Sequence, residues 1–73
     1  MARHEVESEV TGSVWKVLLE AGAAVSEGDV IMILESMKME IPVESPVRGV
    51  LAELCVAPED QVEEDQVLAI VEA

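Results

Sequence analysis

Aromatic residues are almost absent from this sequence. It has no Phe and no Tyr, and Trp15 is the only aromatic side chain among 73 residues. A hydrophobic core must therefore be filled by aliphatic side chains, which a hydrophobic fraction of 51% supplies. The many valines among them favour strands. A chain of this length can form one domain, residues 1–73, around one small core.

Cysteine is nearly absent as well. Cys55 is the only one, so no disulfide can form within the chain. The sequence shows no signal peptide and no apolar run of membrane-spanning length, so we expect a cytoplasmic protein without a membrane partner. Apolar residues surround Cys55 in the sequence, which predicts a small buried thiol and not a nucleophile.

Basic residues are scarce. Four Lys and Arg stand against 16 Asp and Glu, for a formal net charge of −12, which excludes nucleic acid as a partner. The acidic residues are spread along the chain and predict a solvated surface that steers the protein toward a basic cleft. His4 is the only histidine. We find no metal-ligand cluster, no nucleophile with its base and no phosphate-binding loop, and therefore expect no metal site, no catalytic residues and no enzyme activity.

Short strands separated by turn residues run along the chain. Over residues 5–10 acidic residues alternate with apolar or small ones, the pattern of a half-buried strand. Residues 11–13, 20–24 and 27–29 each contain glycine and are predicted to be turns or breaks. No segment has the period of an amphipathic helix. The strands expected around these turns cover residues 5–10, 14–19, a very short piece at Val25, 30–35 and 41–43.

The second half of the chain repeats the first. When residue i is set beside residue i+37, ten of 35 pairs are identical, where composition alone would give roughly three or four. The identical pairs include Ser8 with Ser45 and Gly12 with Gly49. Two matching halves of about four strands each predict an all-β domain of two small antiparallel sheets packed face to face, with two-fold pseudosymmetry.

Lys38 lies at the junction of the two halves, between Met37 and Met39. The flanking strands place it at the apex of a hairpin, at the end of the domain opposite the two termini. At that place the amine is exposed, away from the rest of the domain, on a rigid hairpin. A lysine that another enzyme modifies must be exposed and held in this way. The usual Asn-Gly or Asp-Gly signal of a tight hairpin is missing, so tertiary contacts must hold the turn. An alternative interpretation is that the two methionines belong to the core and the lysine is merely solvated.

The hexapeptide around Lys38 resembles the biotin-attachment motif of biotin carboxyl carrier proteins. That resemblance implies a flattened barrel-sandwich of two four-stranded antiparallel sheets with quasi-two-fold symmetry, in which the modified lysine lies at an exposed hairpin about 35 residues before the C-terminus. Lys38 has 35 residues after it. The resemblance extends to residues 27–29 and 48–50. Its most specific part is Glu35, Ser36, Met37, Lys38, Met39 and Glu40.

Lipoyl domains share this fold, and the residues beside the lysine separate the two families. Lipoyl domains usually have an acidic residue before the lysine and a small one after it, whereas this chain has Met37 and Met39, as biotinyl domains do. Ser36 stands where these carriers often have Ala. Residues 20–24 are too short for the protruding thumb loop of some bacterial acetyl-CoA carboxylase carriers, and no Pro/Ala-rich linker is present, so we expect a free-standing biotinyl protein.

The resemblance implies that a biotin protein ligase joins biotin to Lys38. Biotin carboxylase and a carboxyltransferase would be the other partners, between which Lys38 shuttles carboxybiotin. Met37 and Met39 are expected to be read by the ligase, and Glu35 and Glu40 to be solvated and to contact it, in preference to acting as general acids or bases. We expect a monomer in isolation. A lipoyl carrier using the same lysine and an unmodified interaction module remain the alternatives.

Overall fold

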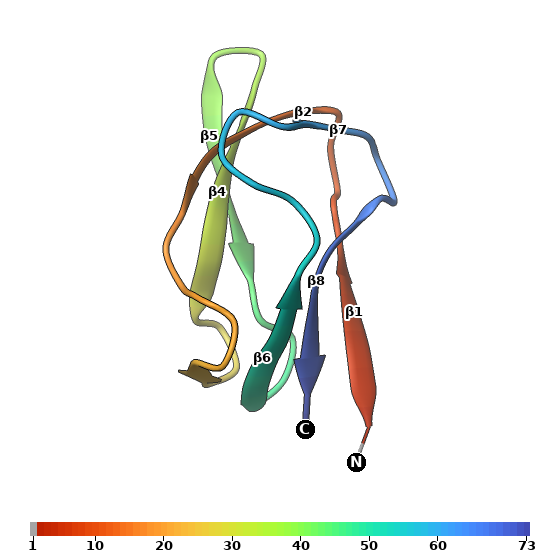
Figure 1. Ribbon diagram of the computed structural model, residues 1–73. Helices are drawn as coiled ribbons and strands as arrows, with labels where there is room; N and C mark the ends of the chain where they lie inside the picture. The colour runs from red at the N-terminus through yellow and green to blue at the C-terminus, as the bar shows by residue number, and fades with distance from the viewer. Residues whose placement is uncertain (1) are drawn as a thin grey trace.

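Two antiparallel sheets pack face to face in the computed structural model, which describes residues 2–73 (Figure 1). Each sheet has four strands, and the described residues contain no helix. One sheet has the order β1 (Arg3–Glu7), β8 (Val67–Glu72), β6 (Gly49–Leu54) and β3 (Ala24–Val25). The other has the order β5 (Met39–Glu44), β4 (Val30–Ser36), β2 (Gly12–Val17) and β7 (Gln61–Val62). The predicted fold class is thereby confirmed.

The core between the sheets is aliphatic, as the lack of aromatic residues requires. Trp15 lies outside it, with 45% of its surface exposed. Half of the core residues come from two strands, β4 and β8, which occupy inner positions in different sheets and consist largely of branched aliphatic residues. The buried core comprises Val6, Val14, Val25, Ile31, Met32, Leu34, Val43, Leu51, Val62, Leu68, Ala69 and Val71.

Residues that match between the two halves of the sequence also make matching contacts in the structure. The Ser8 hydroxyl donates to the carbonyl of Val10 at 2.6 Å, and the Ser45 hydroxyl donates to the carbonyl of Val47 at the same distance. Both serines are buried. Each half also contributes strands to both sheets, so neither half can bury its apolar residues alone.

All four predicted boundaries of the first two strands are wrong. The first strand begins at Arg3, two residues before the predicted start. The first strand ends at Glu7 and not at Val10, because the Ser8 side chain turns the backbone by bonding both the carbonyl and the N–H of Val10. The next strand begins at Gly12, inside the expected turn at 11–13, because Gly12 pairs with Val62 of β7. That strand ends at Val17, two residues before the predicted end.

The prediction for Cys55 is also wrong, because its thiol is exposed. Cys55 follows the last residue of β6, and its backbone N–H still donates to the carbonyl of Leu68 at 2.9 Å. The backbone is therefore fixed to the sheet while the side chain faces solvent. Apolar neighbours in the sequence do not bury a residue that stands where a strand ends.

The connection between β2 and β3 is short, as predicted. It spans residues 18–23 and is closed by a hydrogen bond from the Ala23 N–H to the carbonyl of Glu20 at 3.1 Å. No thumb-like loop protrudes at this place in the described chain. Within residues 2–73 we also find no helix of the length and hydrophobicity needed to cross a membrane.

The β4–β5 hairpin and the two chain ends lie at opposite ends of the molecule (Figure 1). The molecule measures 35 × 19 × 18 Å along its principal axes, so these ends are separated along its long dimension. Ala2 and Ala73 exchange two backbone hydrogen bonds, of 3.2 and 2.9 Å, at the end far from the hairpin. The predicted opposition of Lys38 and the termini is confirmed.

Candidate functional site

The hairpin that carries Lys38 has a loop of only two residues. β4 and β5 pair as far as Ser36 with Met39, which leaves Met37 and Lys38 as the turn. Their φ angles are 52° and 65°, both in the left-handed region. Two consecutive residues of this kind are the mark of a type I′ turn, whose twist matches that of the strands it joins. For residues other than Gly, each such φ costs roughly 1 kcal/mol, so the rest of the domain must hold the turn.

The side chains of the turn face solvent. Lys38 is exposed, and Met37 and Met39 expose 92% and 64% of their surfaces. The interpretation of these methionines as core residues is therefore wrong. Both ion pairs found within residues 2–73 belong to Arg3, which contacts Glu53 at 3.0 Å and Glu72 at 2.8 Å. The amine of Lys38 thus has no carboxylate partner in the described structure.

The chain's other lysine is held differently. The Nζ of Lys16 lies 4.8 Å from the centre of the Trp15 ring, in a cation–π contact on the surface of β2. Lys16 is exposed and lies within β2. Of the two lysines, only Lys38 stands at a turn.

A segment distant in the sequence holds the hairpin next to its turn. The hydroxyl of Ser36 donates to the carbonyl of Thr11 at 2.8 Å, and the Oγ1 of Thr11 accepts the backbone N–H of Glu64 at 3.4 Å. Next to Thr11, a side chain on Gly12 would overlap the carbonyl oxygen of Glu35, so only glycine lets β2 approach β4 this closely. These are the tertiary contacts that the missing turn signal led us to expect.

The roles of Thr11 and Gly12 at the site were not predicted. The 37-residue repeat gave a partial signal for Gly12, because Gly12 matches Gly49. The lack of a side chain at Gly49 makes room for the carbonyl of Glu72 in the same way. Nothing in the local sequence pointed to Thr11.

The remaining residues of the motif lie on the two strands of the hairpin. Glu35 and Glu40 are exposed cross-strand partners, directly opposite each other. Within the described chain neither is in an ion pair. Their predicted solvation is confirmed, and their contact with a ligase stays a prediction.

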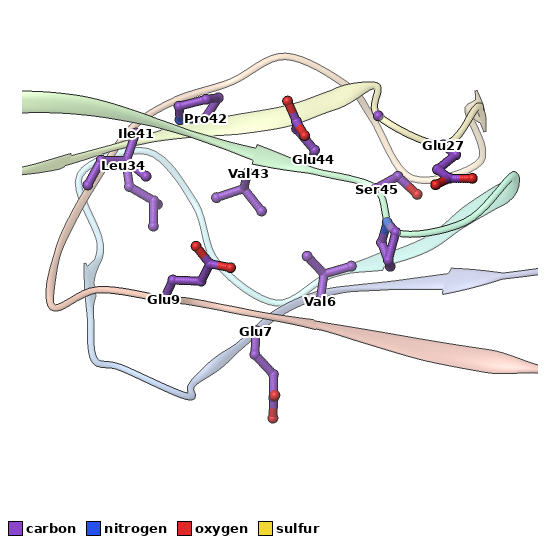
Figure 2. Close-up of a pocket in the computed structure, with 12 residues that line it drawn as sticks. Val6, Glu7, Glu9, Glu27, Leu34, Ile41, Pro42, Val43, Glu44 and Ser45 are labelled. Carbon is purple, nitrogen blue, oxygen red and sulfur yellow. The ribbon is translucent and has the colours of Figure 1, made fainter.

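A hollow of about 350 Å³ opens along the side of the sandwich, between the edge strands β1 and β5 (Figure 2). Val6 and Val43 point into it from opposite strands, while Glu7 points away. Lys38 and its two neighbours do not line it. The carboxylates around it are exposed, and the described residues contain no group of three acidic, His or Cys side chains placed to hold a metal ion. The hairpin is therefore the candidate site.

Comparison with known proteins agrees with this geometry. The model of the biotin/lipoyl family, described as "Biotin-requiring enzyme", matches residues 4–71. The chain belongs to this family. It is 36% identical over 67 residues to the biotinylated protein TB7.3 homolog of Mycobacterium leprae, covering 92% of this chain and 94% of that protein. It is 40% identical over 63 residues to the biotin/lipoyl attachment protein of Bacillus subtilis, covering 86% of each.

A solved structure extends the likeness to a large carboxylase. The chain superposes on part of the crystal structure of Kluyveromyces lactis urea carboxylase with a TM-score of 0.93 and 29% identity. The match covers 99% of this biotin/lipoyl chain and 6% of the carboxylase. The predicted family and fold are both confirmed, and domains of this kind form parts of carboxylases.

Proposed function

We propose that the protein is a biotin carboxyl carrier and that biotin is attached to Lys38. The observation that carries this proposal is an exposed lysine without a carboxylate partner, at the apex of a two-residue hairpin in a member of the biotin/lipoyl family. The exposed methionines on both sides of the lysine match the biotin-attachment motif.

Each residue of the turn has a role in this proposal. The neutral amine of Lys38 would displace AMP from the carboxyl group of biotin after a biotin protein ligase has activated that group with ATP, and the resulting amide would carry no charge. Met37 and Met39 offer flexible, polarizable surface for a biotin protein ligase to grip. When bound, biotin supplies the ureido nitrogen that is carboxylated and later gives up the carboxyl group. The left-handed turn holds Lys38 beyond the end of the sandwich, so its side chain can enter a partner's active site.

The partners follow from the same reasoning. A biotin protein ligase would load the domain, and a biotin carboxylase and a carboxyltransferase would use it in turn. The likeness to a domain of urea carboxylase supports a carrier for this class of enzyme. The biotin carboxylase and the carboxyltransferase would catalyse the two reactions, so the domain needs no catalytic groups. It would work in the cytoplasm beside these partners. Tethering supplies an effective biotin concentration on the order of millimolar.

Modification in vitro tests the proposal. The purified protein is incubated with a biotin protein ligase, biotin and ATP, and the products are read by intact mass and peptide mapping. We expect one biotinyl increment, on the peptide that contains Lys38. Lys38→Arg should take none and keep its fold, and the matched control Lys16→Arg, which keeps a cation over Trp15, should be modified like the wild type. A biotinylated Lys38→Arg protein, or an unmodified wild type, would refute the proposal.

A lipoyl carrier is the second candidate. The relative in Bacillus subtilis is named for attachment of either group. A lipoate ligase in place of the biotin ligase would then load Lys38 and produce a lipoyl increment. An unmodified chain after both reactions would favour the interaction-module alternative.

A further inference from the structure

We propose that Ser36 is a positioning residue for the modification of Lys38. Where biotinyl domains often have Ala, this chain has a hydroxyl that ties the hairpin to the body of the domain. The inference rests on the proposed function, because it concerns how the same lysine is presented to the ligase.

The position of the bond makes Ser36 the outermost lateral support of the hairpin. β2 pairs with β4 only as far as Ser13 with Glu35, so no residue of the hairpin beyond Glu35 is paired with β2. Ser36 and Met39 pair with each other and with no third strand. The bond from the Ser36 hydroxyl to the carbonyl of Thr11 is therefore the last described hydrogen bond between the hairpin and another segment before the turn at Met37 and Lys38.

The acceptor of that bond is itself fixed. Thr11 lies between the buried Ser8 turn and the start of β2, and its hydroxyl accepts the backbone N–H of Glu64 in the β7–β8 connection. The Ser36 hydroxyl thus joins the lysine hairpin to a segment held by the opposite half of the chain. A hairpin that is hydrogen-bonded to a fixed segment moves less than one held only by the hydrogen bonds between its own two strands.

The bond between Ser36 and Thr11 is not repeated in the second half of the chain. Ser8 and Gly12 each have an identical counterpart 37 residues later, with the same contact. The counterpart of Ser36 is Ala73, which has no hydroxyl, and that of Thr11 is Arg48. The two halves therefore differ at this contact, and the bond occurs only at the end of the molecule that carries Lys38.

The contact acts on the strained turn. Both Met37 and Lys38 hold left-handed φ angles that their side chains disfavour. Without the Ser36 bond the turn would sample other conformations more often, and the fraction of molecules presenting Lys38 correctly would fall. A ligase that requires the turn conformation would then see a lower concentration of competent substrate.

Three variants test this. Ser36→Ala removes the hydroxyl, Ser36→Thr keeps it, and Ser13→Ala is the matched control, since Ser13 lies opposite Glu35 on β2 and its hydroxyl makes no hydrogen bond within the described residues. For each we measure kcat and KM of biotinylation by a biotin protein ligase, amide hydrogen exchange at Met37 to Met39, and the urea midpoint of unfolding.

We expect Ser36→Ala to lower kcat/KM roughly fivefold, the factor that corresponds to one ordinary hydrogen bond, chiefly through a higher KM. Exchange at the turn should accelerate by a similar factor while exchange in β6 and β8 stays unchanged. Ser36→Thr should restore both quantities, and Ser13→Ala should leave both as in the wild type.

The proposal would be overturned if Ser36→Ala had the same kcat/KM and the same exchange rates at the turn as the wild type. It would also be overturned if Ser13→Ala lost as much kcat/KM as Ser36→Ala. If the wild type accepts no biotin at all, the proposed function fails, and the exchange rates alone then decide whether Ser36 holds the turn.

Discussion

Glu35 and Glu40 are direct cross-strand partners in the hairpin that carries Lys38, one pair before the pair that closes its turn. Their carboxylates project from the same face of the sheet, because residues opposite each other in an antiparallel pair share a face. Within the described chain no basic side chain forms an ion pair with either of them. The free domain therefore holds two carboxylates of like charge directly opposite each other beside its proposed modification site.

Removing one of these charges should stabilise the domain slightly. We expect Glu40→Gln to raise the free energy of unfolding by about 0.2–0.5 kcal/mol at low ionic strength, a small gain because both groups are exposed and screened. The gain should shrink at high salt. Glu5→Gln is the control, because it removes the same charge from an exposed position opposite Ile70. Equal gains in both variants, read by urea unfolding, would assign the effect to net charge and not to this pair.

Gly12 should not tolerate a side chain. A methyl group there would overlap the Glu35 carbonyl oxygen, and one on Gly49 would overlap the Glu72 carbonyl oxygen. We expect Gly12→Ala and Gly49→Ala each to lower the free energy of unfolding by about 1–3 kcal/mol. Only Gly12→Ala should also shift the backbone amide resonances of the hairpin. Unchanged urea midpoints would mean that the strands can separate without cost.

The pseudosymmetry also pairs a glycine with a glutamate in a left-handed turn. Gly22 has a φ of 98°, and its counterpart Glu59 has a φ of 77°. Glu59→Gly should raise the free energy of unfolding by about 0.5–1 kcal/mol, because relief of strain outweighs the added freedom of the unfolded chain.

Gly22→Ala gives the reciprocal measurement. It should lower the free energy of unfolding by about 1 kcal/mol from backbone strain alone, because no heavy atom lies within 4 Å of the new methyl group. Changes of the same sign in both variants, measured by thermal or urea unfolding, would contradict this account.

Much of this architecture was predictable because the signals are periodic. Alternating apolar residues in short runs predicted strands, and the 37-residue repeat predicted two matching halves. The repeat also placed Lys38 at a junction, which the structure shows to be the apex of a hairpin. The aliphatic core followed from composition alone.

The features that were not predicted depend on contacts between distant segments or on the places where strands end. Ser36 bonds a residue 25 positions away, and no local pattern reports which loop passes beside a hairpin. The apolar neighbours of Cys55 indicate a hydrophobic segment but not the direction of one side chain after the strand has ended. Ser8 ended β1 early because a buried hydroxyl competed with the ladder for backbone groups.

The pairing of Ala2 with Ala73 also determines how the molecule would respond to tension. β1 is an edge strand, hydrogen-bonded only to β8, and the two chain ends leave these strands at the same end of the sheet. A force that draws the ends apart would load their hydrogen bonds one pair at a time and unzip β1 from β8. The first rupture would occur in the sheet that lacks the lysine, at the greatest distance from it, so Lys38 would remain on an intact hairpin while the opposite end opened.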